Sequence, residues 1–142
     1  FKITQAWLTR FGDKIKGIWA ANDEMAVGAI EALRAEGLNG KIPITGIDGT
    51  APAIQAVAAG DMVGTVDWDP IWVGAMGLSL AYNTKIGKID IAKEPQSHRE
   101  FYGTGVPVTT ESVKAFMEAQ KSPPKLNYDD FWGRVQGQIR YL

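Results

Sequence analysis

The chain has 142 residues, which is long enough for one domain with a buried hydrophobic core. Its 15 Lys and Arg residues nearly balance its 16 Asp and Glu residues, so the net charge of −1 gives no general electrostatic reason to bind nucleic acid. The absence of cysteine excludes disulfides and thiolate metal sites, and the single histidine, His98, disfavours histidine metal clusters and serine–histidine–aspartate triads, so neither a cofactor nor catalysis is expected.

The first dozen residues predict a helix, because Ile3, Ala6, Trp7 and Phe11 recur at helical spacing. This helix leads directly into a predicted strand. A helix in that position normally follows another strand, and none precedes this one. Because the chain also opens with Phe1, we expect a processed or cut product that begins within a repeating strand–helix unit.

Residues 15 to about 82 alternate short apolar runs with helical patterns, which predicts the order strand–helix repeated three times. The strands are expected within residues 16–21, 42–47 and 62–66. A helix with an apolar stripe and a cap at Asn22 or Asp23 follows the first strand, a short helix ending at Gly60 follows the second, and a helix over residues 71–86 follows the third. Trp19, in the middle of the first strand, is expected to pack in the core.

Strands joined by such helices run parallel, so their carboxyl ends gather at one edge of the sheet. We therefore expect a three-layer α/β fold, a parallel Rossmann-like sheet with helices on both faces. Ligands of open parallel sheets bind beyond these carboxyl ends. Polar or aromatic side chains follow all three strands: Asn22 and Asp23, then Asp48, then Asp67, Trp68 and Asp69.

The last third of the chain is less regular. A polar loop is expected at residues 88–99 with His98 exposed to solvent, followed by a strand near residues 100–104, an apolar run at 106–108 and a helix capped at Thr109 or Thr110. A composition change after Ser122-Pro123-Pro124 divides the chain into a domain at 1–122 and a tail at 123–142.

Two motifs associated with enzymes are incomplete. Gly103-Thr104-Gly105 lacks the third glycine and the helix of a dinucleotide loop. Asp48-Gly49-Thr50 resembles the end of the haloacid dehalogenase phosphatase motif, but the nucleophilic aspartate of that motif is replaced by Gly46, which has no attacking atom. The pair Asp67 and Asp69 fits a solvated turn before Pro70 better than an acid–base pair or a cation site.

Three strand-end motifs together resemble the second half of the periplasmic sugar-binding proteins of ABC transporters, the ribose-binding-like type I members. They are AAND at residues 20–23, GIDGT at 46–50 and TVDWDP at 65–70. The similarity runs from about Trp7 to Leu80 and continues more weakly to Thr110.

The resemblance implies one lobe of a two-lobed periplasmic receptor that closes on a sugar about a hinge. It also implies that a membrane permease recognises the closed form. It implies that the N-terminal lobe and the strand before the first helix lie outside this chain. Asn22 and Asp48 are implied to bind sugar hydroxyl groups. Trp68 occupies the position where the family usually has an amide side chain. An indole can stack on a sugar ring and donate one hydrogen bond, but it cannot accept one, so the identity of the sugar is open.

Structural explanations exist for each predicted ligand. Asn22 and Asp23 both suit a helix cap and could have no other role. The resemblance instead implies that Asn22 binds the ligand, which leaves Asp23 as the cap. Asp48 suits an Asp-Gly turn, and Trp68 suits packing as well as a cleft wall. The same fold also occurs in the effector-binding cores of LacI-type transcription regulators. Upstream sequence would decide between the two functions, since a signal peptide indicates transport and a helix-turn-helix indicates regulation.

Overall fold

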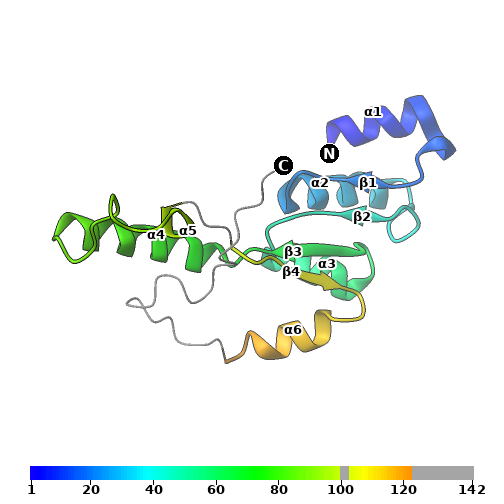
Figure 1. The fold of residues 1–142 in the computed structure, drawn as a ribbon. Helices are drawn as coiled ribbons and strands as arrows, with labels where there is room; N and C mark the ends of the chain where they lie inside the picture. Colours follow the sequence, from blue (N-terminus) through cyan, green and yellow to red (C-terminus); the bar gives the residue numbers. More distant parts are fainter. Residues whose placement is uncertain (100–102, 123–142) are drawn as a thin grey trace. The chain divides into compact units, whose positions relative to one another are not determined.

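The computed structural model describes residues 1–99 and 103–122, which fall into two compact units. The first unit contains residues 1–67 and 106–122, and the second contains residues 68–99 and 103–105. Figure 1 labels the elements of both. The first unit comprises α1 (Lys2–Phe11), the short 3-10 helix η1 (Gly12–Lys14), β1 (Ile18–Trp19), α2 (Asp23–Ala35), β2 (Ile44–Thr45), α3 (Ala51–Ala59), β3 (Gly64–Asp67), β4 (Val106–Thr109) and α6 (Val113–Ala119).

The strands form one sheet in the order β1-β2-β3-β4. The first three strands run parallel, as the sequence predicts, with Ile18 opposite Ile44 and Thr45 opposite Gly64. β4 runs antiparallel to β3, so the parallel sheet of the first three strands is extended by an antiparallel edge strand. The apolar run at 106–108 predicts a strand but carries no signal of its direction.

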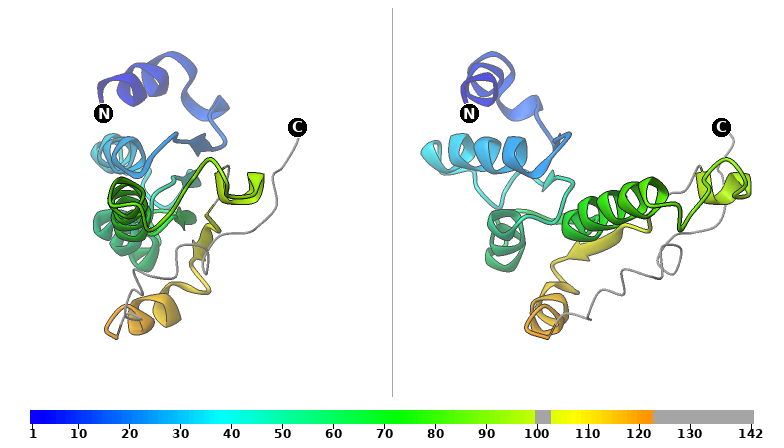
Figure 2. Two further views of the ribbon diagram at one scale, coloured as in Figure 1. Left: turned by 60° about the vertical axis from the view of Figure 1, so that its left-hand side comes forward. Right: turned by 90° about the vertical axis from the view of Figure 1, so that its left-hand side faces the viewer.

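Helices α1, α2, α3 and α6 follow one another beside the sheet, each in contact with the next (Figure 2). α2 packs on β2, and α3 packs on β3 and β4. Side chains of this helix layer and of the sheet face beneath it form the core, which consists of Ala20, Ala26, Ala29, Ile30, Leu33, Ile44, Ala53, Ile54, Val57, Met62, Val108 and Val113.

Trp19 is not part of this core. Its side chain is 74% exposed, so the expectation that it packs in the interior is wrong. Successive strand residues point to opposite faces of a sheet. Because Ile18 and its partner Ile44 face the helix layer, Trp19 and its partner Thr45 face the other side.

Two helix ends show how local sequence sets the boundaries. Gly60 ends α3 in the left-handed conformation at φ 81°, which glycine adopts without a steric penalty. α6 begins after Ser112 and not after the predicted Thr109 or Thr110. The Ser112 hydroxyl accepts a 2.9 Å hydrogen bond from the backbone N–H of Thr109, and this bond closes a turn before the helix.

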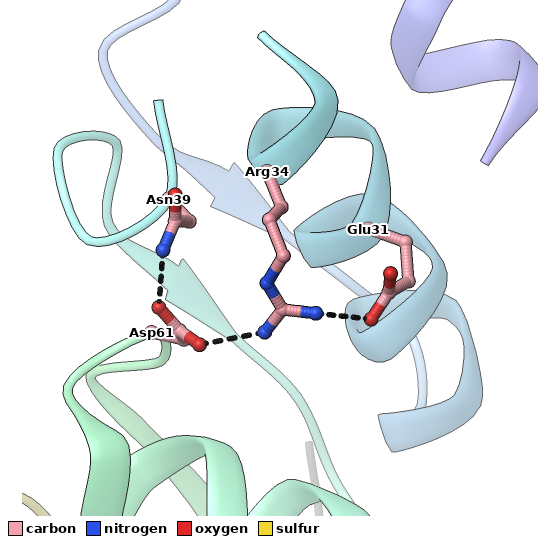
Figure 3. A network of polar contacts seen from close by, with 4 residues as sticks. All are labelled: Glu31, Arg34, Asn39 and Asp61. Atoms are coloured by element: carbon pink, nitrogen blue, oxygen red, sulfur yellow. Dashed lines mark hydrogen bonds and ion pairs between the residues drawn. The ribbon is translucent and has the colours of Figure 1, made fainter. Parts of the chain in front are cut away.

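A polar network joins α2 to the segment that follows α3 (Figure 3). Asp61 accepts a 2.8 Å bond from Arg34 and a 2.9 Å bond from the side-chain amide of Asn39, and Arg34 also pairs with Glu31. The Asn39 and Arg34 bonds lower the pKa of Asp61 below its ordinary value, because both donors stabilise the charged form.

The second unit contains α4 (Pro70–Lys85) and α5 (Gln96–Arg99). Asp69 caps α4 by accepting a 3.0 Å bond from the backbone N–H of Trp72. His98 lies in α5 with its Nδ1 2.6 Å from a Glu94 carboxylate oxygen, and only 30% of its side chain is exposed, so the expected fully solvated histidine is wrong. The strand expected near 100–104 and the tail at 123–142 fall partly or wholly outside the described residues. None of the described helices has the length and hydropathy needed to cross a membrane.

Candidate functional site

The carboxyl ends of β1, β2 and β3 meet at one edge of the sheet in the first unit. The backbone N–H of Asp23, beyond β1, donates to the carbonyl of Ile47 at 2.9 Å. The backbone N–H of Asp48, beyond β2, donates to the carbonyl of Val66 at 2.9 Å. These bonds continue the parallel pairing past the strands, and the structure therefore brings Asn22, Asp23 and Asp48 to a common edge as the sequence predicts.

Asn22 caps helix α2. Its amide oxygen accepts a 2.9 Å hydrogen bond from the backbone N–H of Met25. The expectation that Asp23 supplies this cap is therefore wrong. Both residue types rank high as caps, and the extended backbone of Asn22 (φ −153°, ψ 172°) places its side chain over the helix end. Since the oxygen faces the helix, the amide nitrogen is the Asn22 atom suited to donate to a ligand.

Asp23 is fully buried, with 0% of its surface exposed. Its carboxylate accepts a 2.7 Å bond from the backbone N–H of Thr50, a 3.2 Å bond from the Thr50 hydroxyl and a 2.7 Å bond from the Thr65 hydroxyl. A buried carboxylate is stable only when its oxygens are hydrogen-bonded, and these donors meet that requirement. The sequence predictions do not include this role, although donor-bearing threonines after β2 and within β3 are its signal.

The backbone of Asp48 adopts φ 126°, which side-chain-bearing residues rarely occupy. Such a conformation costs about 1–3 kcal/mol and persists where the surrounding structure enforces it, which is frequently at functional sites. Gly49 follows at φ 73° and is packed so closely that a Cβ atom there would lie 2.7 Å from the Asp67 Cα. Asp48 and Asp67 also form a parallel bridge, so the turn after β2 is fixed against the end of β3.

Trp68 follows β3 and belongs to the second unit. A Cβ atom built on Gly103 would lie 3.9 Å from the Trp68 ring and 3.6 Å from the Trp72 ring, so both indoles lie beside this glycine. Trp68 is 42% exposed, whereas Trp72 is 5% exposed. The Trp68 ring is thus partly packed and partly available for contact, and its contact with a ligand stays a prediction.

The first unit has a cavity at the other end of its strands. A cavity of about 510 Å³ opens among residues of α1, η1 and the segments before β1 and β2, including Leu8, Lys16 and Ile42. This is the amino end of the strands, opposite to Asn22 and Asp48. Across residues 1–99 and 103–122, no three His, Asp or Glu side chains are grouped so as to hold a metal ion.

Residues 1–89 match the sequence model of a family described as the periplasmic binding protein domain. The D-allose-binding periplasmic protein of Escherichia coli is 42% identical over 84 residues, which cover 58% of this chain and 27% of that protein. The ribose import binding protein of Haemophilus influenzae is 38% identical over 93 residues, covering 66% of this chain and 31% of that protein. The chain thus spans less than a third of the length of these curated relatives.

Solved structures show the same likeness. A twin-arginine translocation pathway signal protein from Burkholderia phytofirmans is 50% identical with a TM-score of 0.92, and the match covers 100% of this chain and 44% of that one. A periplasmic solute-binding protein from Actinobacillus succinogenes, solved with bound D-allose, is 35% identical with a TM-score of 0.69 over 80% of this chain and 38% of that one.

Proposed function

Because the chain belongs to the periplasmic binding protein domain family, we propose that it is part of a receptor that binds a sugar for uptake by an ABC transporter. The observation that carries this proposal is the gathering of Asn22 and Asp48 at the carboxyl ends of adjacent parallel strands. In open α/β sheets this is the edge at which ligands bind.

The side chains at this edge suit the hydroxyl groups of a neutral sugar. Each hydroxyl donates one hydrogen bond and accepts up to two. The amide nitrogen of Asn22 donates and the carboxylate of Asp48 accepts, so the pair can bind neighbouring hydroxyls of one ring. A site that leaves such polar groups unpaired when a hydroxyl is missing discriminates by about 10⁴-fold or more.

Trp68 is the third proposed ligand contact. Its half-exposed indole offers an apolar face for the C–H groups of a sugar ring and one N–H donor. Solved neighbours contain bound D-allose or myo-inositol, and one relative is a ribose import binding protein; all three of these compounds carry several hydroxyl groups.

The whole receptor would contain an N-terminal lobe, and its closure over the sugar would exclude water from the site. An ABC-transporter permease would then recognise the closed form in the periplasm. No chemical step is assigned to Asn22, Asp48 or Trp68, whose proposed role is binding.

Titration of the ¹⁵N-labelled chain with millimolar D-ribose, D-allose and xylitol tests the proposal. We expect amide shifts near Asn22 and Asp48 with at least one sugar. Asp48→Asn removes the carboxylate but keeps a residue that tolerates positive φ, and it should weaken binding at least tenfold. Glu36→Gln, which removes an exposed carboxylate at the other end of α2, is the matched control and should leave the affinity unchanged. Equal affinity of both variants for the sugar would overturn the proposed site.

A further inference from the structure

Asp23 connects three parts of the candidate site through one buried side chain. It directly follows Asn22, and its carboxylate holds both the backbone N–H and the hydroxyl of Thr50, two residues after Asp48. The other carboxylate oxygen accepts from Thr65 on β3. Asp23 therefore ties the segments that follow β1 and β2 to β3 from within the protein.

The space around this carboxylate is filled on the strand side. A Cβ atom added at Gly46 would lie 2.4 Å from Asp23 Oδ1 and 2.7 Å from Met62 Cε. The glycine at this position therefore allows the β2 backbone to pass directly beside the carboxylate. Gly49, in the same turn, is equally crowded against Asp67. The turn and the carboxylate fit each other closely.

Helix capping does not account for Asp23. A carboxylate in the first turn of a helix is favoured by the helix dipole. The cap of α2, however, is supplied by Asn22, and the Asp23 side chain accepts its hydrogen bonds from Thr50 and Thr65, which lie outside α2. Those bonds act on the turn that sets the unusual backbone of Asp48 at φ 126°.

We infer that Asp23 is a positioning residue: it contacts no ligand, and it holds the Asp48–Thr50 turn in the conformation that presents Asp48 to a sugar hydroxyl. This inference rests on the proposed sugar-binding function. The required feature is a buried acceptor facing Thr50, so the geometry of the side chain matters more than its charge. Asparagine can supply that acceptor with its amide oxygen while its amide nitrogen donates to Thr65, whose hydroxyl can turn to accept.

The experiment compares Asp23→Ala and Asp23→Asn in the ¹⁵N-labelled 142-residue chain, with Val57→Ala as the control. Val57 lies in the core on α3, so its truncation destabilises the fold without removing a bond to the turn. Free energies of unfolding from urea titrations identify variants of similar stability. The affinities for D-ribose and D-allose, and the chemical shift and exchange rate of the Thr50 amide, are the readouts.

We expect Asp23→Ala to weaken sugar binding at least tenfold and to speed exchange of the Thr50 amide at least tenfold. Asp23→Asn should stay within about threefold of the parent chain in both measurements, and Val57→Ala should keep the parent affinity. The inference would be overturned if Asp23→Ala and Val57→Ala had the same sugar affinity and the same Thr50 amide shift and exchange rate. A tenfold loss of affinity in Val57→Ala as well would also overturn it, because general destabilisation would then explain the effect.

Two further outcomes are decisive. If Asp23→Ala does not fold, Thr65→Val removes one of the three donors at nearly constant volume and should weaken binding severalfold, whereas unchanged binding would contradict the inference. If the parent chain binds neither sugar, the proposed function fails for these probes. The chemical shift and exchange rate of the Thr50 amide, compared between Asp23→Asn and Asp23→Ala, then still show whether Asp23 holds the turn.

Discussion

The carboxylate of Asp23 lies 2.7 Å from the backbone N–H of Thr50, although 27 residues separate them in the chain. This bond joins the start of α2 to the start of α3 beneath the edge where the parallel strands end. It also explains why two neighbouring residues of one motif have different roles. Asn22 is half-buried and acts as the helix cap and proposed ligand contact, while Asp23 is fully buried and supports the turn after β2.

Replacement of Gly46 by alanine tests how closely the chain fits around Asp23. The new methyl group would lie 2.4 Å from the carboxylate oxygen, so we expect a loss of about 1–3 kcal/mol in the free energy of unfolding. Gly17→Ala is the control, because its methyl group would make ordinary 3.6 Å contacts with Pro43. Urea unfolding measures both variants. Equal stabilities would show that the carboxylate can move aside freely.

The two roles of Asn22 can be separated by substitution. Asn22→Asp keeps an oxygen that can cap α2 but removes the amide donor, so we expect near-parent stability together with at least tenfold weaker sugar binding. Asn22→Ala should lower the free energy of unfolding by about 1 kcal/mol and also weaken binding. Urea unfolding and sugar titration give both quantities. If Asn22→Asp bound sugar as tightly as the parent chain, the role of Asn22 would be helix capping and not ligand binding.

The Asp61 network predicts how stability depends on pH. Bonds from Asn39 and Arg34 hold the pKa of Asp61 below its ordinary value in the folded chain. A lowered folded-state pKa stabilises the fold at pH values above the unfolded pKa, and this contribution is lost as the pH falls through the folded pKa. We therefore expect a stability contribution that is present near pH 6 and disappears below about pH 4.

Asp61→Asn tests that dependence. The variant should be less stable than the parent at pH 6, and the difference should shrink as the solution is acidified towards pH 2.5. Thermal unfolding at several pH values measures it, with Asp90→Asn as a control in an exposed ion pair with Lys93. A stability difference between Asp61→Asn and the parent that does not change with pH would contradict the assigned cause.

Much of the fold follows from local sequence signals, and the exceptions have physical reasons. Apolar runs with polar ends predict β1, β2 and β3, and the glycine at position 60 predicts the end of α3. The exposure of Trp19 could not be predicted, because a short apolar run does not reveal which face of the strand the helices cover.

The candidate site also has features that the sequence predicts and features that it does not. The strand-end positions of Asn22 and Asp48 could be predicted, because parallel strands place their carboxyl ends together. That Asn22 and not Asp23 caps α2 could not be predicted, because both residue types suit a cap. The outcome depends on Thr50 and Thr65, which are close to Asp23 only in the folded chain. The direction of β4 likewise depends on its pairing with β3.

The chain on its own should bind sugar weakly. It carries the edge with Asn22 and Asp48 and spans 44% of the Burkholderia phytofirmans structure, and the proposed receptor encloses its sugar with a second lobe. We expect isothermal titration calorimetry to give a dissociation constant in the millimolar range for D-ribose or D-allose. Submicromolar affinity would show that these residues form a complete site without a second lobe.

Chemical-shift mapping of the ¹⁵N-labelled chain during sugar titration tests the binding edge most directly. We expect the largest changes at the amides of Asn22, Asp48 and Thr50 and at the indole N–H of Trp68. Changes confined to the cavity beside Leu8 and Ile42, at the other end of the strands, would contradict this expectation.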